Sequence, residues 1–311
     1  MPTRFAVAVL FCACFPGCAA TDLSDLPDLP AGQALRVEGE SLFVRQSGSG
    51  PDIVLLHGLG DSSLGWQYIE GPLVEAGYRV TVWDALGAGR SAKPRAGDYS
   101  IAAHVRRLEA VLDRLGIERA TVVGHSLGGS LALVFAHAHP ERTAALCLVD
   151  PAAYREGALG GRWFWEVPLL AEIVLGVLST EMLVDFGMKQ NYANAARIPE
   201  LLRKLYIREA RREAMISALI HQERQLVPAD PEAWEAGHRT IRAPTLILWG
   251  ANDALVPVAQ GPRLARDIPG AELVVLPDLA HSPQLEDPSA VLDHLLPFLD
   301  AQRRGRCESH W

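Results

Sequence analysis

Short apolar runs alternate with helical stretches along the chain from Leu35 onward. Each run is aliphatic or β-branched and is bounded by Gly, Pro or Asp, which is the pattern of buried strands. Strands that alternate with helices are typical of an α/β fold, a largely parallel sheet with helices on both faces. The candidate strands are residues 35–38, 42–46, 52–56, 79–83, 121–123, 145–149, 245–249 and 273–276, and the first two suggest an opening hairpin.

The clearest helical pattern between these strands covers residues 100–115. Its apolar residues fall on one stripe that is expected to pack on the sheet: Ile101, Val105, Leu108, Val111, Leu112 and Leu115. Residues 151–240 show no clear strand pattern and are therefore predicted to form a helical insertion. Within it, the charged stretch 200–223 is predicted to be a solvent-facing helix.

The first 20 residues have the pattern of an export signal, with a single charge at Arg4, an apolar run over 5–15, and small residues after it. That run is too short to span a bilayer. Phe15-Pro16-Gly17-Cys18 resembles the bacterial lipoprotein cleavage box, so Cys18 is a candidate for lipidation and membrane anchoring. Cleavage after Ala20, which would release a secreted protein, and an uncleaved apolar tail are the alternatives. Residues 21–33 are predicted to form a linker.

The composition narrows the classes of function. The 311 residues are 49% hydrophobic and carry a net charge of −8 without a basic block, so a nucleic-acid partner is not expected. Three of the five cysteines lie in the N-terminal segment, which leaves Cys147 and Cys307 for the body of the protein. A disulfide framework is therefore not predicted.

The most specific chemical motif is Gly124-His125-Ser126-Leu127-Gly128, which joins a predicted strand to a predicted helix. A strand, a G-x-S-x-G turn and a helix form a nucleophile elbow, in which the serine occupies a strained turn and is raised clear of the sheet. The other interpretation of the motif is a glycine-rich turn. The strand–helix context favours Ser126 as a catalytic nucleophile.

A serine nucleophile needs a base within hydrogen-bond reach and an acid that orients the base. His281 follows the last predicted strand, and Asp253 follows the strand before it, at the carboxyl edge where a parallel sheet collects its functional groups. We therefore predict His281 as the base and Asp253 as the acid. Asp150, after the strand at 145–149, is a rival for the orienting role.

Attack on a carbonyl places negative charge on oxygen, and two backbone N–H groups aimed at that oxygen would stabilise it. One candidate is Leu127, directly after the nucleophile and at a helix N-terminus. The other is Leu59, in His57-Gly58-Leu59-Gly60, where the flanking glycines allow the backbone to turn. His57 is interpreted as a structural hydrogen-bonding residue.

Taken in order, HGLG, GHSLGG, LILWGANDALVP and LAHSPQLEDP resemble the α/β-hydrolase superfamily over about residues 35–303. The resemblance implies an eight-stranded, mostly parallel sheet with a helical cap inserted after the sixth strand. It divides the chain into a signal (1–20), a linker (21–33), a core (34–150 and 241–303), a cap (151–240) and a tail (304–311). The segment from Asp84 to Ser91 also resembles the family's Asp-x-x-Gly-x-Gly-x-Ser loop, with Ala88 in place of a common His.

The same resemblance implies a cofactor-free serine esterase or lipase that releases an acid from an acyl-serine by means of water. Carboxylic esters of apolar small molecules or lipids are the expected substrates. A C–C bond hydrolase, a cofactor-free perhydrolase or haloperoxidase, and a non-catalytic scaffold are the alternatives. The meta-cleavage C–C hydrolases usually have Asn before the nucleophile and Trp after the catalytic His, whereas this chain has His125 and Ser282.

Weaker patterns are not expected to carry function. The segment 87–92 matches the dinucleotide pattern G-x-G-x-x-A, but Pro94 interrupts the helix that should follow it. His137 and His139 are two residues apart and cannot share a helical face, so no metal site is predicted.

The apolar runs 163–170 and 173–178 are predicted to line an apolar acyl or aromatic pocket over Ser126; the cap's own core or a dimer contact is the alternative.

Overall fold

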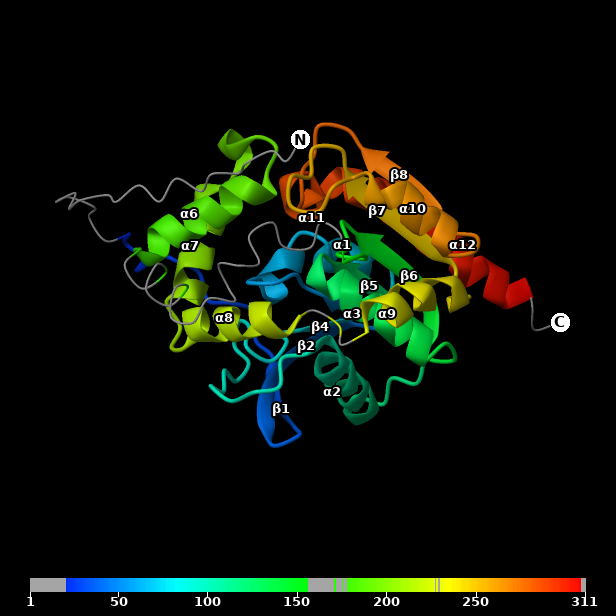
Figure 1. The fold of residues 1–311 in the computed structure, drawn as a ribbon, viewed down its shortest axis with the longest axis horizontal. Helices are drawn as coiled ribbons and strands as arrows, with labels where there is room; N and C mark the ends of the chain where they lie inside the picture. The colour runs from blue at the N-terminus through cyan, green and yellow to red at the C-terminus, as the bar shows by residue number, and fades with distance from the viewer. Residues whose placement is uncertain are drawn as a thin grey trace.

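The computed structural model describes residues 21–155, 171, 175, 178–226, 228 and 230–308 of the chain. Its centre is a sheet of eight strands in the order β1-β2-β4-β3-β5-β6-β7-β8 (Figure 1). The strands are β1 (Gln33–Val37), β2 (Glu40–Gly48), β3 (Asp52–Leu56), β4 (Arg79–Trp83), β5 (Ala120–His125), β6 (Thr143–Val149), β7 (Thr245–Gly250) and β8 (Glu272–Leu276). The predicted eight-stranded α/β sheet is confirmed.

Pairing within the sheet is antiparallel only at the edge where the chain begins. β1 and β2 form the predicted hairpin, and β2 pairs antiparallel with β4. From β4 to β8 every neighbouring pair is parallel. The carboxyl ends of β3, β5, β6, β7 and β8 therefore meet at one edge, where the predicted functional residues follow them.

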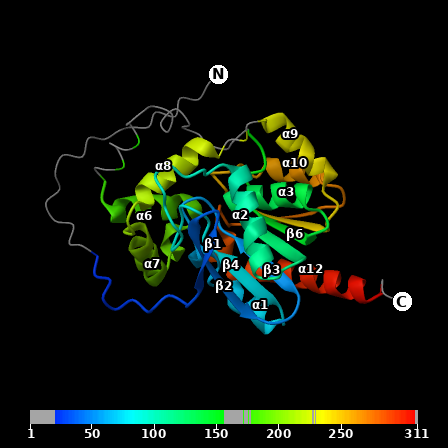
Figure 2. The ribbon, with the colours of Figure 1, turned by 90° about the horizontal axis from the view of Figure 1, so that it is seen from below.

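Helices cover both faces of the sheet (Figure 2). One face is packed by α2 (Ile101–Arg114), α3 (Leu127–Ala138) and α10 (Gln260–Asp267), and the other by α1 (Glu70–Glu75) and α12 (Pro288–Glu308). The predicted helix at 100–115 is α2; it begins where the Ser100 hydroxyl accepts the Ala103 N–H, and its apolar stripe is buried. Each buried aliphatic side chain of this kind contributes about 1.5–3 kcal/mol.

The segment between β6 and β7 contains helices in its described part. These are α6 (Thr180–Asn191), η2 (Ala195–Arg197), α7 (Glu200–Ala210), α8 (Met215–Gln225), α9 (Pro231–Gly237) and η3 (His238–Thr240). In both views α6 and α7 lie to one side of the sheet (Figures 1 and 2). The runs assigned to an acyl pocket lie almost wholly outside the described residues, and the domain boundaries stay predictions.

The prediction of a single solvent-facing helix over 200–223 is wrong. The backbone breaks at Ala214, whose φ is 60°, and this turn separates α7 from α8. Both helices bury an apolar stripe, including Leu205 on α7 and Ile220 on α8. The charged side chains that suggested full exposure instead pair with neighbours, as Arg203 does with Asp185. The many charged residues of this segment therefore obscured the apolar stripes that α7 and α8 bury.

The linker follows the surface of the protein. The Arg208 guanidinium on α7 donates to the Pro27 carbonyl at 2.9 Å, and the Arg90 guanidinium donates to the Pro30 carbonyl at 2.9 Å. Residues 1–20 lie outside the described part of the chain, so the export signal stays a prediction. Among the described residues, no helix has the length and apolar character needed to cross a membrane.

Candidate active site

Ser126 occupies the turn between β5 and α3. Its φ and ψ are 51° and −115°, which is a strained conformation for a residue other than glycine. The turn is tight enough to require glycine on both sides, since a Cβ at Gly124 would lie 2.3 Å from the Gly128 carbonyl oxygen and one at Gly128 would lie 2.1 Å from the Leu56 carbonyl oxygen. The local sequence thus produces the raised serine that G-x-S-x-G predicts.

The three residues predicted to carry catalysis lie together. Nε2 of His281 is 2.9 Å from the Ser126 hydroxyl, and Nδ1 is 2.7 Å from Oδ2 of Asp253. A carboxylate only accepts hydrogen bonds, so Nδ1 carries the proton and Nε2 is left to accept the serine O–H. Asp253 and His281 are buried, and this strengthens their interaction.

Asp253 is held in place by the backbone of its own loop, which follows β7. Its Oδ1 accepts the N–H groups of Leu255 at 2.8 Å and of Val256 at 2.9 Å. These two donors fix the plane of the carboxylate, and they leave Oδ2 to face His281. The acid is therefore oriented before any substrate arrives.

Asp150, the rival acid, lies next to Asp253 rather than against His281. It follows β6 with φ of 44°, is fully buried, and accepts the Gly250 N–H on Oδ1 at 2.8 Å. One possible ligand atom from each of Asp150, Asp253 and His281 lies within 4.8 Å of the others. Among the described residues, this is the group of side chains close enough together to hold a metal ion. However, the direct hydrogen bond between His281 and Asp253 already occupies the atoms that face each other.

His125 has a part in the site that the sequence did not indicate. Its Nε2 donates to the His281 carbonyl oxygen at 2.6 Å, and the two ring centroids are 4.9 Å apart. Burial places the pKa of His125 well below its usual range, and the neighbouring His281 lowers it further, so the ring is neutral. The residue before the nucleophile thus anchors the loop that carries the histidine.

The second oxyanion candidate, Leu59, lies in the loop after β3. Hydrogen bonds of His57 connect this loop to the segment after β4. His57 Nδ1 donates to the Gly58 carbonyl at 2.7 Å, and Nε2 accepts the Ala85 N–H at 3.0 Å. The hydrogen bonds agree with the structural role predicted for His57. Leu127, the first oxyanion candidate, begins α3, where its N–H is not used by the helix.

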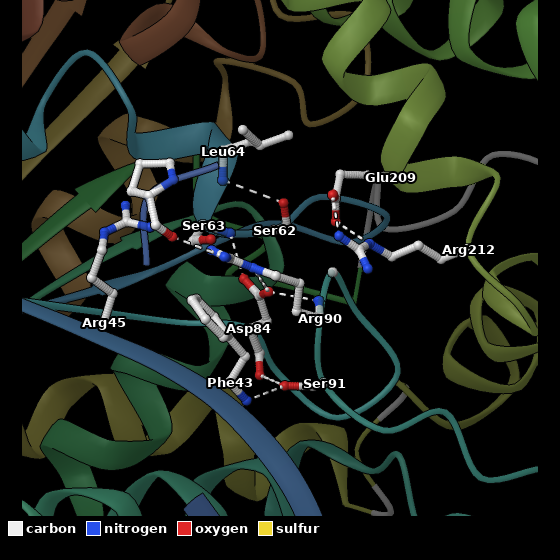
Figure 3. A network of polar contacts seen from close by, with 12 residues as sticks. Phe43, Arg45, Ser62, Ser63, Leu64, Asp84, Arg90, Ser91, Glu209 and Arg212 are labelled. Atoms are coloured by element: carbon white, nitrogen blue, oxygen red, sulfur yellow. Dashed lines mark hydrogen bonds and ion pairs between the residues drawn. The ribbon is translucent and has the colours of Figure 1, made fainter. Parts of the chain in front are cut away.

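A polar network around Asp84 holds the residues that follow this loop (Figure 3). The Asp84 carboxylate accepts the N–H groups of Ser63 and Arg90, both at 2.7 Å. Ser91 donates to the Asp84 carbonyl oxygen and accepts the Phe43 N–H at 2.9 Å. The network thus connects β2, the segment after β4 and η1 (Ser63–Trp66), and it explains the Asp and Ser of the family-like loop.

Helices between β6 and β7 also contact the segment that follows β3. The Tyr206 hydroxyl of α7 donates to Asp61 Oδ1 at 2.6 Å, and a Cβ at Gly60 would lie 3.6 Å from Leu219 Cδ1 of α8. Burial raises the pKa of the Asp61 carboxyl. Next to His281 in the sequence, the Ser282 hydroxyl donates to Asn191 Oδ1 of α6 at 2.8 Å. The insertion is therefore bonded to the loops on both sides of Ser126.

A sheet that delivers a serine, an aspartate and a histidine from the carboxyl ends of the parallel strands β5, β7 and β8 defines an α/β-hydrolase-fold protein. A family model described as alpha/beta hydrolase fold matches residues 51–288. The chain belongs to the α/β-hydrolase family, and it is a hydrolase of that fold.

Individual relatives extend this assignment. The chain is 32% identical over 281 residues to a 2-hydroxy-6-oxo-6-phenylhexa-2,4-dienoate hydrolase of Burkholderia cepacia, covering 83% of this chain and 91% of the relative. It is 31% identical over 281 residues to a 2-hydroxy-6-oxononadienedioate/2-hydroxy-6-oxononatrienedioate hydrolase of Comamonas testosteroni, with coverage of 83% and 91%. A solved structure of a putative lipase from Acinetobacter baumannii AYE has a TM-score of 0.74 at 28% identity, covering 88% of this chain and 92% of that one.

Proposed function

We propose that the protein is a serine hydrolase that transfers an acyl group from its substrate to water through Ser126. The observation that carries the proposal is the buried chain of hydrogen bonds from Asp253 through His281 to Ser126. His281 takes the serine proton as Oγ attacks the carbonyl carbon, and the N–H groups of Leu59 and Leu127 receive the developing negative charge.

The second half of the reaction uses the same groups. His281 passes its proton to the leaving group as the bond to the acyl carbon breaks, and it then takes a proton from water, which attacks the acyl-serine. The products are a carboxylic acid and the protonated leaving group, and Ser126 is restored with its proton. The chemistry balances with water as the only co-reactant, so these residues require no cofactor for it.

The first candidate for the bond cleaved is a carbon–carbon bond beside a ketone. Both relatives compared above are named as hydrolases of 2-hydroxy-6-oxo-dienoates, so the relatives favour this alternative over the ester hydrolysis expected from the sequence. Such a bond breaks only when the departing carbon is stabilised as a dienolate. The dienoate part of these substrates provides that stabilisation, and His281 is placed to return the proton.

The second candidate is a carboxylic ester of an apolar small molecule or lipid. His125 and Ser282 favour it, because the resemblance to meta-cleavage hydrolases implies Asn and Trp at these positions. Here His125 instead anchors the His281 loop, and Ser282 is bonded to Asn191. An ester needs no stabilised carbanion, since its oxygen leaves as an alcohol when His281 protonates it as the C–O bond breaks, so the same chain of residues suffices.

Two substrate series decide between these candidates. The purified protein is assayed with acyl-chain-length esters and with a 2-hydroxy-6-oxo-dienoate, and it is treated with a fluorophosphonate probe. Ser126→Ala should abolish turnover and labelling, whereas Ser289→Ala, at the exposed start of α12, should change neither. Labelling that survives in Ser126→Ala would exclude Ser126 as the nucleophile. The substrate type with the higher kcat/KM identifies whether a carbon–carbon bond or an ester bond is the preferred one.

We also infer that the protein is exported and that Cys18 is a site of lipid anchoring, on the basis of the apolar N-terminal run and the cleavage-box pattern. Mass analysis of the N-terminus from the native host tests this. A lipid-modified Cys18 supports anchoring, a start at Thr21 supports secretion, and a start at Met1 excludes cleavage.

A further inference from the structure

Two carboxyl groups face each other in the buried part of the site. Asp150 is 0% exposed and Asp253 is 8% exposed, and one carboxyl oxygen of Asp150 lies within 4.8 Å of one of Asp253. They come from the ends of adjacent parallel strands, β6 and β7, so the sheet itself holds them together. Two ionised carboxylates this close in a buried site repel each other strongly.

One carboxylate oxygen of this pair, Oδ2 of Asp150, lacks a hydrogen-bond donor among the described residues. Asp253 accepts two backbone N–H groups on Oδ1 and His281 on Oδ2. Asp150 accepts the Gly250 N–H on Oδ1, whereas its Oδ2 has no partner among the described polar groups. A proton on Oδ2 would remove both difficulties, because it turns an orphaned acceptor into a donor and removes the repulsion.

We propose that Asp150 is a positioning residue that keeps its proton and donates it from Oδ2 as a hydrogen bond to the Asp253 carboxylate. Ser126, His281, Asp253 and Asp150 then form a chain of four groups, in which Asp150 fixes the acid that orients the base. The proposal rests on the proposed function for its effect on catalysis. The protonation of Asp150 itself does not depend on any substrate.

The pKa direction of Asp150 and the two nearby histidines agree with one negative charge in this pair of carboxyl groups. Burial, followed by the Asp253 charge, raises the pKa of Asp150 well above its usual range. From β5, His125 is neutral, and from the loop after β8, His281 is bonded to Asp253. With Asp150 protonated as proposed, the carboxylate that faces His281 is that of Asp253, and it can stabilise the imidazolium that forms during catalysis.

The exchange Asp150→Asn provides the sharpest test, because an amide reproduces the neutral carboxyl. The amide oxygen can accept the Gly250 N–H while the NH₂ group donates to Asp253. We expect kcat/KM within about threefold of the wild type and an unchanged midpoint for the acid limb of its pH profile, which reports the base in the free enzyme. Asp150→Ala removes the donor, and we expect kcat to fall about 10- to 100-fold with KM little changed.

Three catalytic outcomes would overturn the proposal. If Asp150 were ionised, Asp150→Asn would remove a charge within about 5 Å of the base and would lower the acid-limb midpoint by roughly two pH units. If Asn and Ala were equally damaging, the shape or charge of Asp150 would matter rather than its donor. If both variants equalled the wild type, Asp150 would have no positioning role.

A spectroscopic measurement separates this proposal from the proposed function. The infrared difference spectrum between wild type and Asp150→Asn at neutral pH should contain the carbonyl band of one protonated carboxyl group, which moves on exchange into D₂O. It needs no substrate and no activity, and thermal unfolding of the same samples shows that both are folded. An ionised carboxylate band in its place would refute the proposal even if the protein hydrolyses esters as expected.

Discussion

Replacing Asp253 by Asn should reduce activity far more than the loss of one hydrogen bond suggests. The N–H groups of Leu255 and Val256 both donate to Oδ1 of Asp253. In Asp253→Asn the amide oxygen must remain there, because the alternative flip would place NH₂ against two donors. The NH₂ group therefore faces His281 Nδ1 and forces the histidine proton onto Nε2, which can then no longer accept the serine proton.

The size of the effect follows from the geometry. Nδ1 of His281 and Oδ2 of Asp253 are 2.7 Å apart. At an effective dielectric constant of about 20, the attraction between an imidazolium and a carboxylate at that distance is about 6 kcal/mol. Since each 1.36 kcal/mol of barrier is a factor of ten, we expect kcat to fall by about four decades.

The assay compares kcat for the wild type, Asp253→Asn, Asp253→Ala and a matched control, Asp287→Asn. Asp287 is half-buried and caps the start of α12, so its exchange tests the loss of a carboxylate away from the site and should change kcat less than twofold. Asp253→Ala leaves the histidine free to choose its tautomer and should retain more activity than Asp253→Asn. If Asp253→Asn kept more than a tenth of the wild-type kcat, Asp253 would not be the orienting acid.

Further predictions concern stability and reactivity. Gly128→Ala should cost about 1–3 kcal/mol of unfolding free energy and lower kcat sharply, because its Cβ would lie 2.1 Å from the Leu56 carbonyl oxygen; urea unfolding checks this, with Gly71→Ala as a control that has open space. Burial lowers the pKa of His104 to about 3, whereas an unfolded histidine titrates near 6.5, so His104 makes the fold less stable as the pH falls between these values, by about 1.4 kcal/mol per unit. Unfolding free energies at pH 6.5 and 4.5 should therefore differ by roughly 2.3 kcal/mol less in His104→Leu than in the wild type, because the unfolded histidine is already half protonated at pH 6.5; equal differences would contradict the reasoning. Burial raises the pKa of the Cys147 thiol to about 12, so maleimide should label the Cys147 peptide only after denaturation; labelling of the native protein at the denatured rate would disprove it.

The sheet and the main site were predictable because their signals are local. A strand such as β4 is a β-branched run bounded by turn residues, and the predicted 79–83 matches Arg79–Trp83. The Ser126 motif encodes a backbone turn that only glycines permit. His281 and Asp253 follow from topology, since parallel strands bring their carboxyl ends to one edge.

The remaining features depend on contacts that no local pattern contains. The donor role of His125 depends on where the His281 carbonyl lies, 156 residues further along the chain. Asp150 and Asp253 were considered as competitors for one role, because their spacing along the chain does not reveal that they share a site. The break at Ala214 was hidden by the charges of α7 and α8, which indicate exposure more strongly than their apolar stripes indicate burial.

The order of the strands has a consequence for the chain while it is being made. Ser126 is synthesised 155 residues before its hydrogen-bond partner His281, and Asp253 also follows it by more than a hundred residues. A nascent chain that ends before β7 and β8 therefore carries the proposed nucleophile without the proposed base. Such a chain cannot yet attack an acyl group, and the enzyme becomes active only after β7 and β8 have joined the sheet.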